Sequence, residues 1–233
     1  AYNVFKKNGN ETIPISMDKN GMKVKELIES DAKIAYVMPS HQFPLGIVMP
    51  IKRRIELLEW TKCGDDRYII EDDYDSEFRY KGKPIPALQG VDNAGKVIYL
   101  GTFSKSIAPS IRMSYMVLPI EMLEKFNDKM SFYSQTVSKM DQMIVNEFIR
   151  DGYYERHLNK MRSVYKAKHD LLITLLKESK GSIQISGENS GLHILVNVNN
   201  SMTEEKLISK AKNLGVCVHG LSEYYIEQKH YYK

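Results

Sequence analysis

The feature that most constrains this chain is a lysine placed just after a short apolar segment. Residues 97–100 are Val-Ile-Tyr-Leu, a run that predicts a strand buried on both faces. The run breaks at Gly101 into a polar loop, where Lys105 lies between two serines. Open α/β sheets bind ligands at the carboxyl ends of their strands, and partial desolvation there would favour the neutral amine that attacks a carbonyl to form a Schiff base. The sequence thus predicts a reactive amine; the alternative is a solvated lysine in a Ser/Thr-rich loop.

The same loop carries groups that could bind an anion. Thr102 and Ser104 offer hydroxyls, and Arg112 offers a planar set of donors. Such donors suit a cluster of anionic oxygens, as in a phosphate group.

An acidic segment upstream is expected to meet this loop. Residues 68–78 begin as a second apolar run and end in carboxylates interleaved with Tyr74. If both runs are strands of one parallel sheet, two strand ends of opposite charge converge at the same edge. Asp75 and Glu77 are interpreted as members of a solvated turn.

Five motifs give the chain a family resemblance. In chain order they are SHQFPLG at 40–46, IEDDYDSEF at 70–78, IPALQ at 85–89, GTFSKS at 101–106 and RMSYMVLP at 112–119. Together they resemble the fold-type I aminotransferases that use pyridoxal 5'-phosphate (PLP). They resemble more closely the aminotransferase-like domain of the MocR/GabR transcriptional regulators of the GntR family. A weaker similarity extends over nearly the whole chain.

The resemblance implies roles for individual residues. Lys105 would form the internal aldimine with PLP, and Asp72 would face the pyridine nitrogen, because the interval 105 − 72 = 33 matches the regulator pattern. Tyr74, two residues after Asp72, would bond the ring hydroxyl. An anion against the ring nitrogen keeps it protonated, so that the ring can accept electrons. By the same match the phosphate would be held by Thr102, Ser104 and Arg112.

The loop at residues 39–46 departs from the aminotransferase pattern. Where those enzymes usually carry an asparagine just before the proline, this chain carries Phe43. The departure leaves one contact to the ring hydroxyl open, and His41 or Gln42 could supply it. For each, a bond to the local backbone is an equal alternative.

Alternating strands and helices predict an α/β fold with a mostly parallel, helix-covered sheet. Strands are expected at residues 33–38, 67–72, 96–101 and 112–118. An amphipathic helix is expected at 50–62, with Ile51, Ile55, Leu58 and Trp60 as its apolar side chains and Arg53, Arg54 and Glu56 as its polar ones.

Two domains are expected. Residues 1–150 would form the large PLP-binding domain of fold type I, and residues 151–233 a long connecting helix followed by a smaller α+β domain. In the second part, the patterns predict strands at 182–186, 192–198 and 216–219 and a helix at 204–214. The large domain would lack its beginning and the small one its end, because the chain opens without methionine and stops where a new segment should begin.

Composition narrows the class of protein. Neither a signal peptide nor an apolar run of about 18 residues is present, and a formal net charge of +4 is too small and dispersed to indicate nucleic-acid binding by itself. Cys63 and Cys217 lie far apart in positions expected to adjoin the core, which indicates reduced thiols in a cytoplasmic protein. No metal site is expected.

Two function classes remain open. The favoured hypothesis is an effector-sensing domain that binds PLP on Lys105 and senses an amino compound by aldimine exchange. It would act as a homodimer and reach DNA only through a winged helix outside this chain. The alternative is a genuine aminotransferase, which moves an amino group between an amino acid and a 2-oxo acid with Lys105 as the proton shuttle. A third reading is an inert fragment, because the arginine that clamps a substrate carboxylate would lie beyond the last residue.

Overall fold

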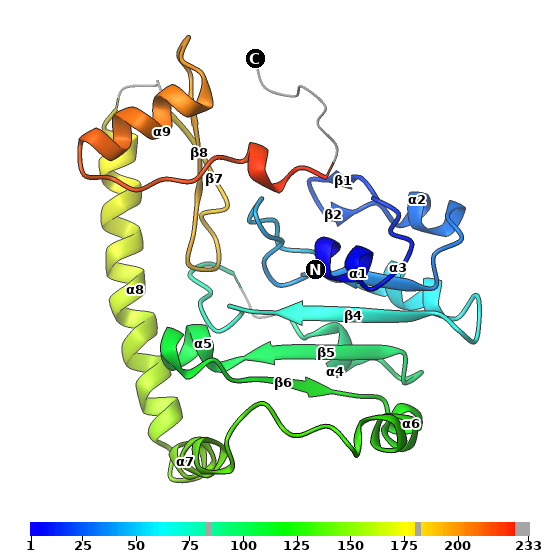
Figure 1. Cartoon of the computed structure of the whole chain (residues 1–233). Coiled ribbons are helices and arrows are strands. Elements are labelled where there is room, and N and C mark those ends of the chain that lie inside the picture. Colours follow the sequence, from blue (N-terminus) through cyan, green and yellow to red (C-terminus); the bar gives the residue numbers. More distant parts are fainter. Residues whose placement is uncertain (83–84, 180–182, 227–233) are drawn as a thin grey trace.

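The centre of the molecule is a four-stranded mixed sheet (Figure 1). This computed structural model describes residues 1–82, 85–179 and 183–226. The sheet has the order β3 (Ile34–Val37), β4 (Tyr68–Asp73), β5 (Val97–Thr102) and β6 (Ser114–Val117). Strands β3, β4 and β5 run parallel, whereas β6 is antiparallel to β5. The expected α/β fold with a mostly parallel sheet is confirmed.

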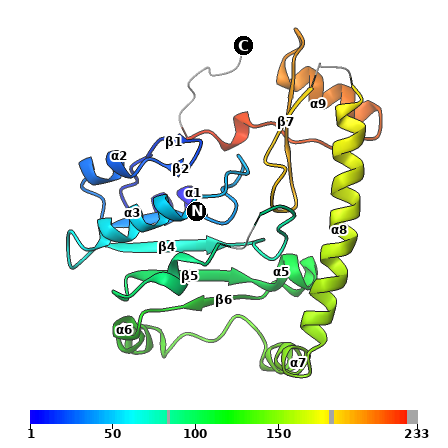
Figure 2. The ribbon, with the colours of Figure 1, turned by 180° about the vertical axis from the view of Figure 1, so that it is seen from behind.

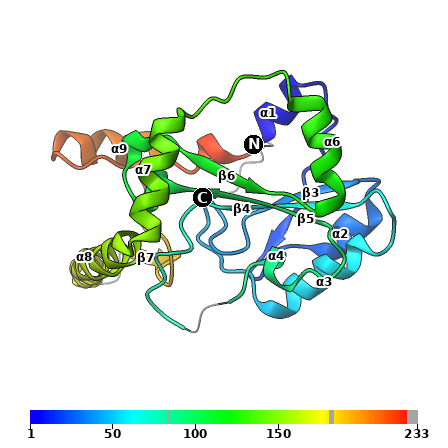
Figure 3. The same ribbon diagram turned by 90° about the horizontal axis from the view of Figure 1, so that it is seen from below.

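The two faces of the sheet differ. Helices α2 (Val24–Glu29), α3 (Ile51–Thr61) and α4 (Leu88–Val91) lie on one face, while α1 (Tyr2–Lys7) lies on the other (Figure 3). Burial along β4 accordingly alternates between buried and half-buried residues. The prediction of a strand buried on both faces is therefore wrong for β5, because the α1 face is more open than the helix-covered face.

The hydrophobic core lies between the sheet and its covering helices. It contains Val24, Leu27, Ala35, Val37, Met49, Leu57, Trp60, Ile69, Leu88 and Val97. These residues come from α2, α3, α4, the three parallel strands and the segment before α3. The helix-covered face is thus the one that stabilises the fold by apolar burial.

Helix α3 turns a different face inward from the one predicted. Ile51 and Ile55 are 45% and 50% exposed, whereas Arg54 is only 1% exposed. The Arg54 guanidinium donates to the carbonyl oxygens of Met49 (3.0 Å), Pro86 (2.9 Å) and Pro39 (2.9 Å). A buried charge with these partners is tolerated, so the polar residue takes an inward position that hydrophobic periodicity assigns to an apolar one.

Glu71 of β4 completes this buried polar group. One of its carboxylate oxygens lies 3.8 Å from an Arg54 nitrogen. The backbone N–H groups of Leu88 and Gln89, at the start of α4, each donate to Glu71 at 2.9 Å. Burial raises the pKa of Glu71, and these hydrogen bonds oppose the rise. Arg54 and Glu71 therefore tie β4, α4 and the segments around Pro39 and Pro86 into one unit.

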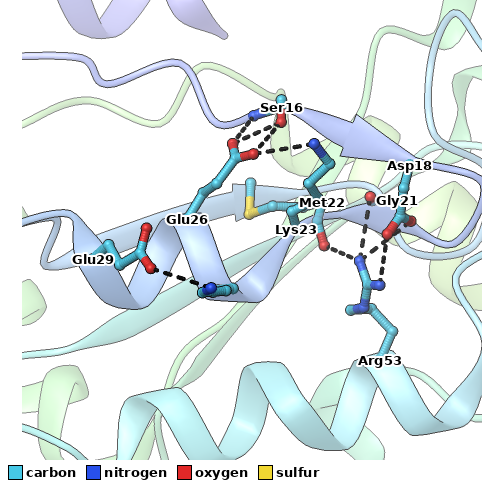
Figure 4. A network of polar contacts seen from close by, with 9 residues as sticks. Ser16, Asp18, Gly21, Met22, Lys23, Glu26, Glu29 and Arg53 are labelled. Carbon is cyan, nitrogen blue, oxygen red and sulfur yellow. Dashed lines mark hydrogen bonds and ion pairs between the residues drawn. The ribbon is translucent and has the colours of Figure 1, made fainter.

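A polar network holds the N-terminal hairpin of β1 (Met17–Asp18) and β2 (Gly21–Met22) against α2 and α3 (Figure 4). Arg53 of α3 pairs with Asp18 at 2.8 Å and donates to the Met22 carbonyl at 2.5 Å. Glu26 of α2 accepts from the Ser16 backbone N–H at 2.9 Å. The hairpin is thus anchored by side chains of both helices.

After β5 the chain is mainly helical. It forms α5 (Phe103–Ser106), the 3-10 turn η1 (Pro109–Ile111), strand β6, and then α6 (Ile120–Met130), α7 (Lys139–Arg150) and α8 (Tyr153–Lys177). Helix α8 runs from α7 past α5 toward the C-terminal elements (Figure 2). It contacts the segment that follows β4 through Arg162, whose Nε donates to the Glu77 carbonyl at 2.8 Å.

The C-terminal part contains the antiparallel pair β7 (Ile183–Ser186) and β8 (Leu195–Val198), helix α9 (Glu204–Asn213) and the 3-10 turn η2 (Ser222–Tyr224). Residue 182 of the predicted strand 182–186 lies outside the described residues. The predicted strand at 216–219 is wrong: Val216 and Val218 are 55% and 42% exposed, and no described strand pairs with them.

Both cysteines are exposed, so their expected position beside the core is wrong. Among the helices of the described ranges, none combines the length and the apolar character needed to cross a membrane.

Candidate functional site

The predicted site residues gather where β4 and β5 end. Asp72 is next to last in β4, Thr102 ends β5, and Lys105 follows in α5. The register pairs Asp72 with Leu100, so Asp72, Leu100 and Thr102 alternate onto the sheet face opposite α2, α3 and α4. A cavity of about 350 Å³ lies there, and its lining includes Asp72, Gly101, Thr102, Ser114 and Tyr115.

Asp72 has one partner that sequence reasoning missed. The Tyr36 hydroxyl of β3 donates a hydrogen bond to one Asp72 carboxylate oxygen. The other oxygen has no hydrogen-bond partner in the part of the chain that the structure describes. Burial raises the pKa of Asp72, and the Tyr36 hydrogen bond opposes that rise. Side chains alternate between the two faces of a strand, so the strand predicted at residues 33–38 could have indicated this contact. In the observed register Tyr36 lies on the same sheet face as Asp72.

Lys105 extends into the open rather than into an apolar environment. Its side chain is exposed, and its ammonium group has no hydrogen-bond or ion-pair partner among the described residues. The expected desolvation is therefore not found, because the α1 side of the strand ends carries little protein. Lys105 nevertheless acts electrostatically on His193. Burial is the main cause that lowers the pKa of His193, and the charges of His41 and Lys105 lower it further.

The three residues expected to bind an anion lie beside Lys105. Thr102 caps α5: its Oγ1 accepts from the Ser104 backbone N–H at 3.1 Å. The same Thr102 Oγ1 donates to the Met113 carbonyl at 3.2 Å. Arg112, just before Met113, has a left-handed backbone (φ 47°), an exposed side chain and no described acceptor for its guanidinium group. Arg112 therefore leaves all its donors open beside the α5 turn.

Tyr74 and His41 are brought together. The Tyr74 hydroxyl donates to the His41 carbonyl at 2.8 Å and lies 3.2 Å from His41 Nδ1. The same Nδ1 lies 2.9 Å from an Asp75 carboxylate oxygen. Gln42 is bonded locally, with its amide nitrogen 3.3 Å from the Phe43 carbonyl oxygen. The motif around residue 41 thus lies directly against the end of the acidic segment.

The acidic segment is more buried than predicted. Asp75 is 1% exposed, so its interpretation as part of a solvated turn is wrong. Glu77 is half-buried, and burial raises the pKa of its carboxyl group. No local pattern indicates this burial, because the histidine that pairs with Asp75 lies 34 residues earlier in the chain.

The loop between β7 and β8, called the C-terminal loop here, lies against this cluster. The His193 ring lies 4.4 Å from the His41 ring, centre to centre, and His193 Nε2 lies 2.9 Å from the Pro44 carbonyl oxygen. His193 is therefore a structural histidine with a hydrogen-bond partner. Gly191 is required beside it, because a Cβ there would overlap the His41 ring and its φ of +78° is left-handed.

An α/β sheet with a lysine, a carboxylate and a turn carrying hydroxyl and guanidinium donors at neighbouring strand ends resembles the arrangement of PLP-dependent transferases. The chain belongs to the aminotransferase class I and II family, whose model matches residues 4–230. This family implies dependence on PLP.

Comparison with known proteins narrows the family assignment. The chain is 44% identical over 223 residues to the HTH-type transcriptional regulator YdeL of Bacillus subtilis, covering 95% of this chain and 48% of YdeL. It is 31% identical over 217 residues to the probable rhizopine catabolism regulatory protein MocR of Rhizobium meliloti, covering 93% and 44%. The expected resemblance to MocR-type regulators is confirmed. The chain spans about half the length of the curated relatives it matches.

The fold is shared with solved aminotransferases. The multiple substrate aminotransferase of Thermococcus profundus superposes with a TM-score of 0.80 at 30% identity, covering 92% of this chain and 56% of that enzyme. The fold-type I expectation is thereby confirmed.

Proposed function

We propose that this chain is the PLP-binding, effector-sensing domain of a MocR-type transcriptional regulator. The observation that carries the proposal is that Lys105 and Asp72 lie at neighbouring strand ends in a chain 44% identical to an HTH-type regulator. Residues 1–150 would form the PLP-binding domain, and residues 151–233 the connecting helix and the small domain. This boundary falls between α7 and α8.

The residues present fit PLP. Asp72 faces a cavity with one carboxylate oxygen unpartnered among the described residues, and the cationic groups of Lys105 and Arg112 have no described acceptor. Three kinds of group are thus available to a ligand: a carboxylate for the pyridine nitrogen, a primary amine for the aldehyde and a guanidinium that can donate hydrogen bonds to the phosphate. When bound, PLP supplies an aldehyde that combines with primary amines and a ring that accepts electrons.

Each residue then has a defined task. The Lys105 amine would hold the cofactor at its aldehyde, and the Asp72 carboxylate would keep a proton on the ring nitrogen. Tyr36 supports Asp72 by donating to its carboxylate. Thr102, Ser104 and Arg112 would hold the phosphate. Thr102 also fixes the α5 turn by accepting from the Ser104 backbone N–H.

The ring hydroxyl would be contacted from the Tyr74 side. The phenol of Tyr74 is positioned by His41, and Gln42 lies in the same loop, so that these three residues are the candidates for this contact. His41 would act mainly through Tyr74, because its ring already faces Asp75.

The proposal extends to partners. A small amino compound or amino acid would compete with Lys105 for the aldehyde, and the domain would work as a cytoplasmic homodimer. Contact with DNA would come from another part of the whole protein. The names of the regulator relatives support this reading.

The test is covalent attachment of PLP to a single lysine. The chain is incubated with PLP, reduced with borohydride and mapped by mass spectrometry, beside Lys105→Ala and the matched exposed variant Lys125→Ala from α6. We expect the label on Lys105, its loss in Lys105→Ala and its retention in Lys125→Ala. A label on a different lysine, or an unchanged label in Lys105→Ala, would overturn the assignment.

The alternative, a genuine aminotransferase, is favoured by the likeness to the Thermococcus profundus enzyme. It is tested on the full-length protein with an amino acid and a 2-oxo acid acceptor. Sustained turnover at about 1 s⁻¹ or faster, the range of ordinary enzymes, would replace the sensor with an enzyme. Binding without turnover would support the sensor.

A further inference from the structure

A second cavity lies near the carboxyl end of β4, on the other side of the sheet. It has a volume of about 500 Å³, and its lining includes Asp73, Glu77, Arg79, Tyr99 and Arg162. Asp73 and Tyr99 alternate onto the face that α2, α3 and α4 cover, opposite to Asp72. The cavity is therefore separate from the one beside Lys105.

Several charged groups of this cavity already have partners. Asp73 accepts from the Tyr99 hydroxyl at 2.8 Å and from the Ser76 backbone N–H at 3.1 Å. Arg54 is bonded to carbonyl oxygens as described above. Arg162 donates to the Glu77 carbonyl at 2.8 Å and to the Asn159 side chain at 3.1 Å. These groups form the walls of the cavity rather than its open binding positions.

Two groups of opposite charge remain open. The Arg79 Nε is enclosed and has no hydrogen-bond partner in the part of the chain that the structure describes. The Glu77 carboxylate has no side-chain partner among the described residues. Although both line the same cavity, no ion pair joins them within the described ranges. The enclosed Arg79 Nε without an acceptor and the half-buried Glu77 carboxylate without a side-chain donor both carry a desolvation cost that a third group could offset.

The charges define the ligand. A simple anion would satisfy Arg79 but would be repelled by Glu77, and a simple cation would meet the reverse problem. We propose that this cavity binds a small zwitterionic amino compound, with its carboxylate on Arg79 and its ammonium group on Glu77. The volume lies within the range of about 300–1,000 Å³ that is typical of small-molecule sites. This site uses neither Lys105 nor the cofactor, so it goes beyond the proposed function.

The cavity walls come from separate parts of the chain. Arg162 belongs to α8, Glu77 and Arg79 follow β4, and the backbone of Arg79 pairs with that of Ser190 in the C-terminal loop. A ligand held by Glu77 and Arg79 would therefore stiffen the junction between the segment after β4, α8 and this loop.

The experiment uses the chain with Lys105→Ala and no PLP, so that no covalent chemistry can report binding. Calorimetric titrations with glycine, L-alanine and β-alanine are compared with propionate, propylamine and inorganic phosphate. We expect the zwitterions to bind and the singly charged probes to bind at least about tenfold more weakly. Equal binding of phosphate or propionate would show an anion site instead, and no binding of any zwitterion would overturn the proposal.

Variants assign the site. Glu77→Gln and Arg79→Gln should each weaken zwitterion binding at least about tenfold, whereas Glu155→Gln and Arg156→Gln, on the exposed part of α8, should leave it unchanged. If Arg79→Gln does not fold, Arg79→Lys keeps the charge and should give an intermediate loss. Full affinity in both cavity variants would refute the site even if the zwitterions bind elsewhere.

Discussion

Replacing Arg54 by methionine should destabilise the fold more than most single substitutions. Methionine fills a similar volume but leaves the carbonyl oxygens of Met49, Pro86 and Pro39 without their donor. Each buried acceptor without a partner costs about 1–3 kcal/mol, and removing one member of a buried ion pair costs about 3–5 kcal/mol. Because water and local shifts would relieve part of both costs, we expect a loss of about 3–5 kcal/mol in the free energy of unfolding.

The assay is urea unfolding followed by circular dichroism, with Lys52→Met as the matched control. Lys52 is exposed in the same helix, so its replacement should change stability by less than about 0.5 kcal/mol. The double variant Arg54→Met, Glu71→Gln should lose less than the sum of the single variants, because Arg54 and Glu71 interact at 3.8 Å. A loss below about 1 kcal/mol for Arg54→Met would refute the reasoning, since it would mean that the three carbonyls do not depend on the guanidinium.

Three further predictions concern other parts of the molecule. Asp72→Asn should weaken PLP binding at least about tenfold while the fold survives, measured by fluorescence titration; unchanged affinity in this variant, with a loss in Asp73→Asn, would move the role by one residue. Gly191→Ala should cost clearly more unfolding free energy than Gly9→Ala, because both glycines have left-handed φ values (+78° and +80°) but only the first has no room for a Cβ; equal losses would show that the backbone angle alone matters. The pKa of Glu26 is lowered from 4.5 to about 2, chiefly by the Ser16 hydroxyl, so its contribution to stability is present above pH 4.5 and is lost as the pH falls toward 2. Melting temperatures between pH 2 and 6 should therefore fall less steeply for Glu26→Gln, and parallel curves would contradict this.

The elements with strong local patterns could be predicted from the sequence. The runs at 67–72 and 96–101 contain β-branched residues bounded by polar turns, and the strands lie at Tyr68–Asp73 and Val97–Thr102. The motifs also predicted that Asp72, Thr102 and Lys105 would lie at one sheet edge. That placement follows from parallel strands alone, whose carboxyl ends lie together.

What could not be predicted depends on partners distant in sequence. Arg54 is buried because carbonyl oxygens of remote segments receive its donors, and a helical pattern counts it as a surface residue. Asp75 is buried because His41 faces it, although acidic residues after a strand usually lie in solvated turns. The strand expected at 216–219 has suitable residues but no neighbouring strand within the described ranges, and β-propensity depends on such a neighbour.

The contacts of the C-terminal loop bear on the order in which the protein is made. The Leu192 backbone N–H donates to Asp75 at 3.2 Å across 117 positions of the chain, and His193 reaches Pro44 across 149. During synthesis, at about 5–20 residues per second, the sheet strands leave the ribosome well before this loop does. The surroundings of Tyr74 and His41 are thus completed only after Leu192 and His193 have been translated. A nascent chain would have its sheet and Lys105 early, and the contacts of the C-terminal loop with Asp75 and Pro44 later.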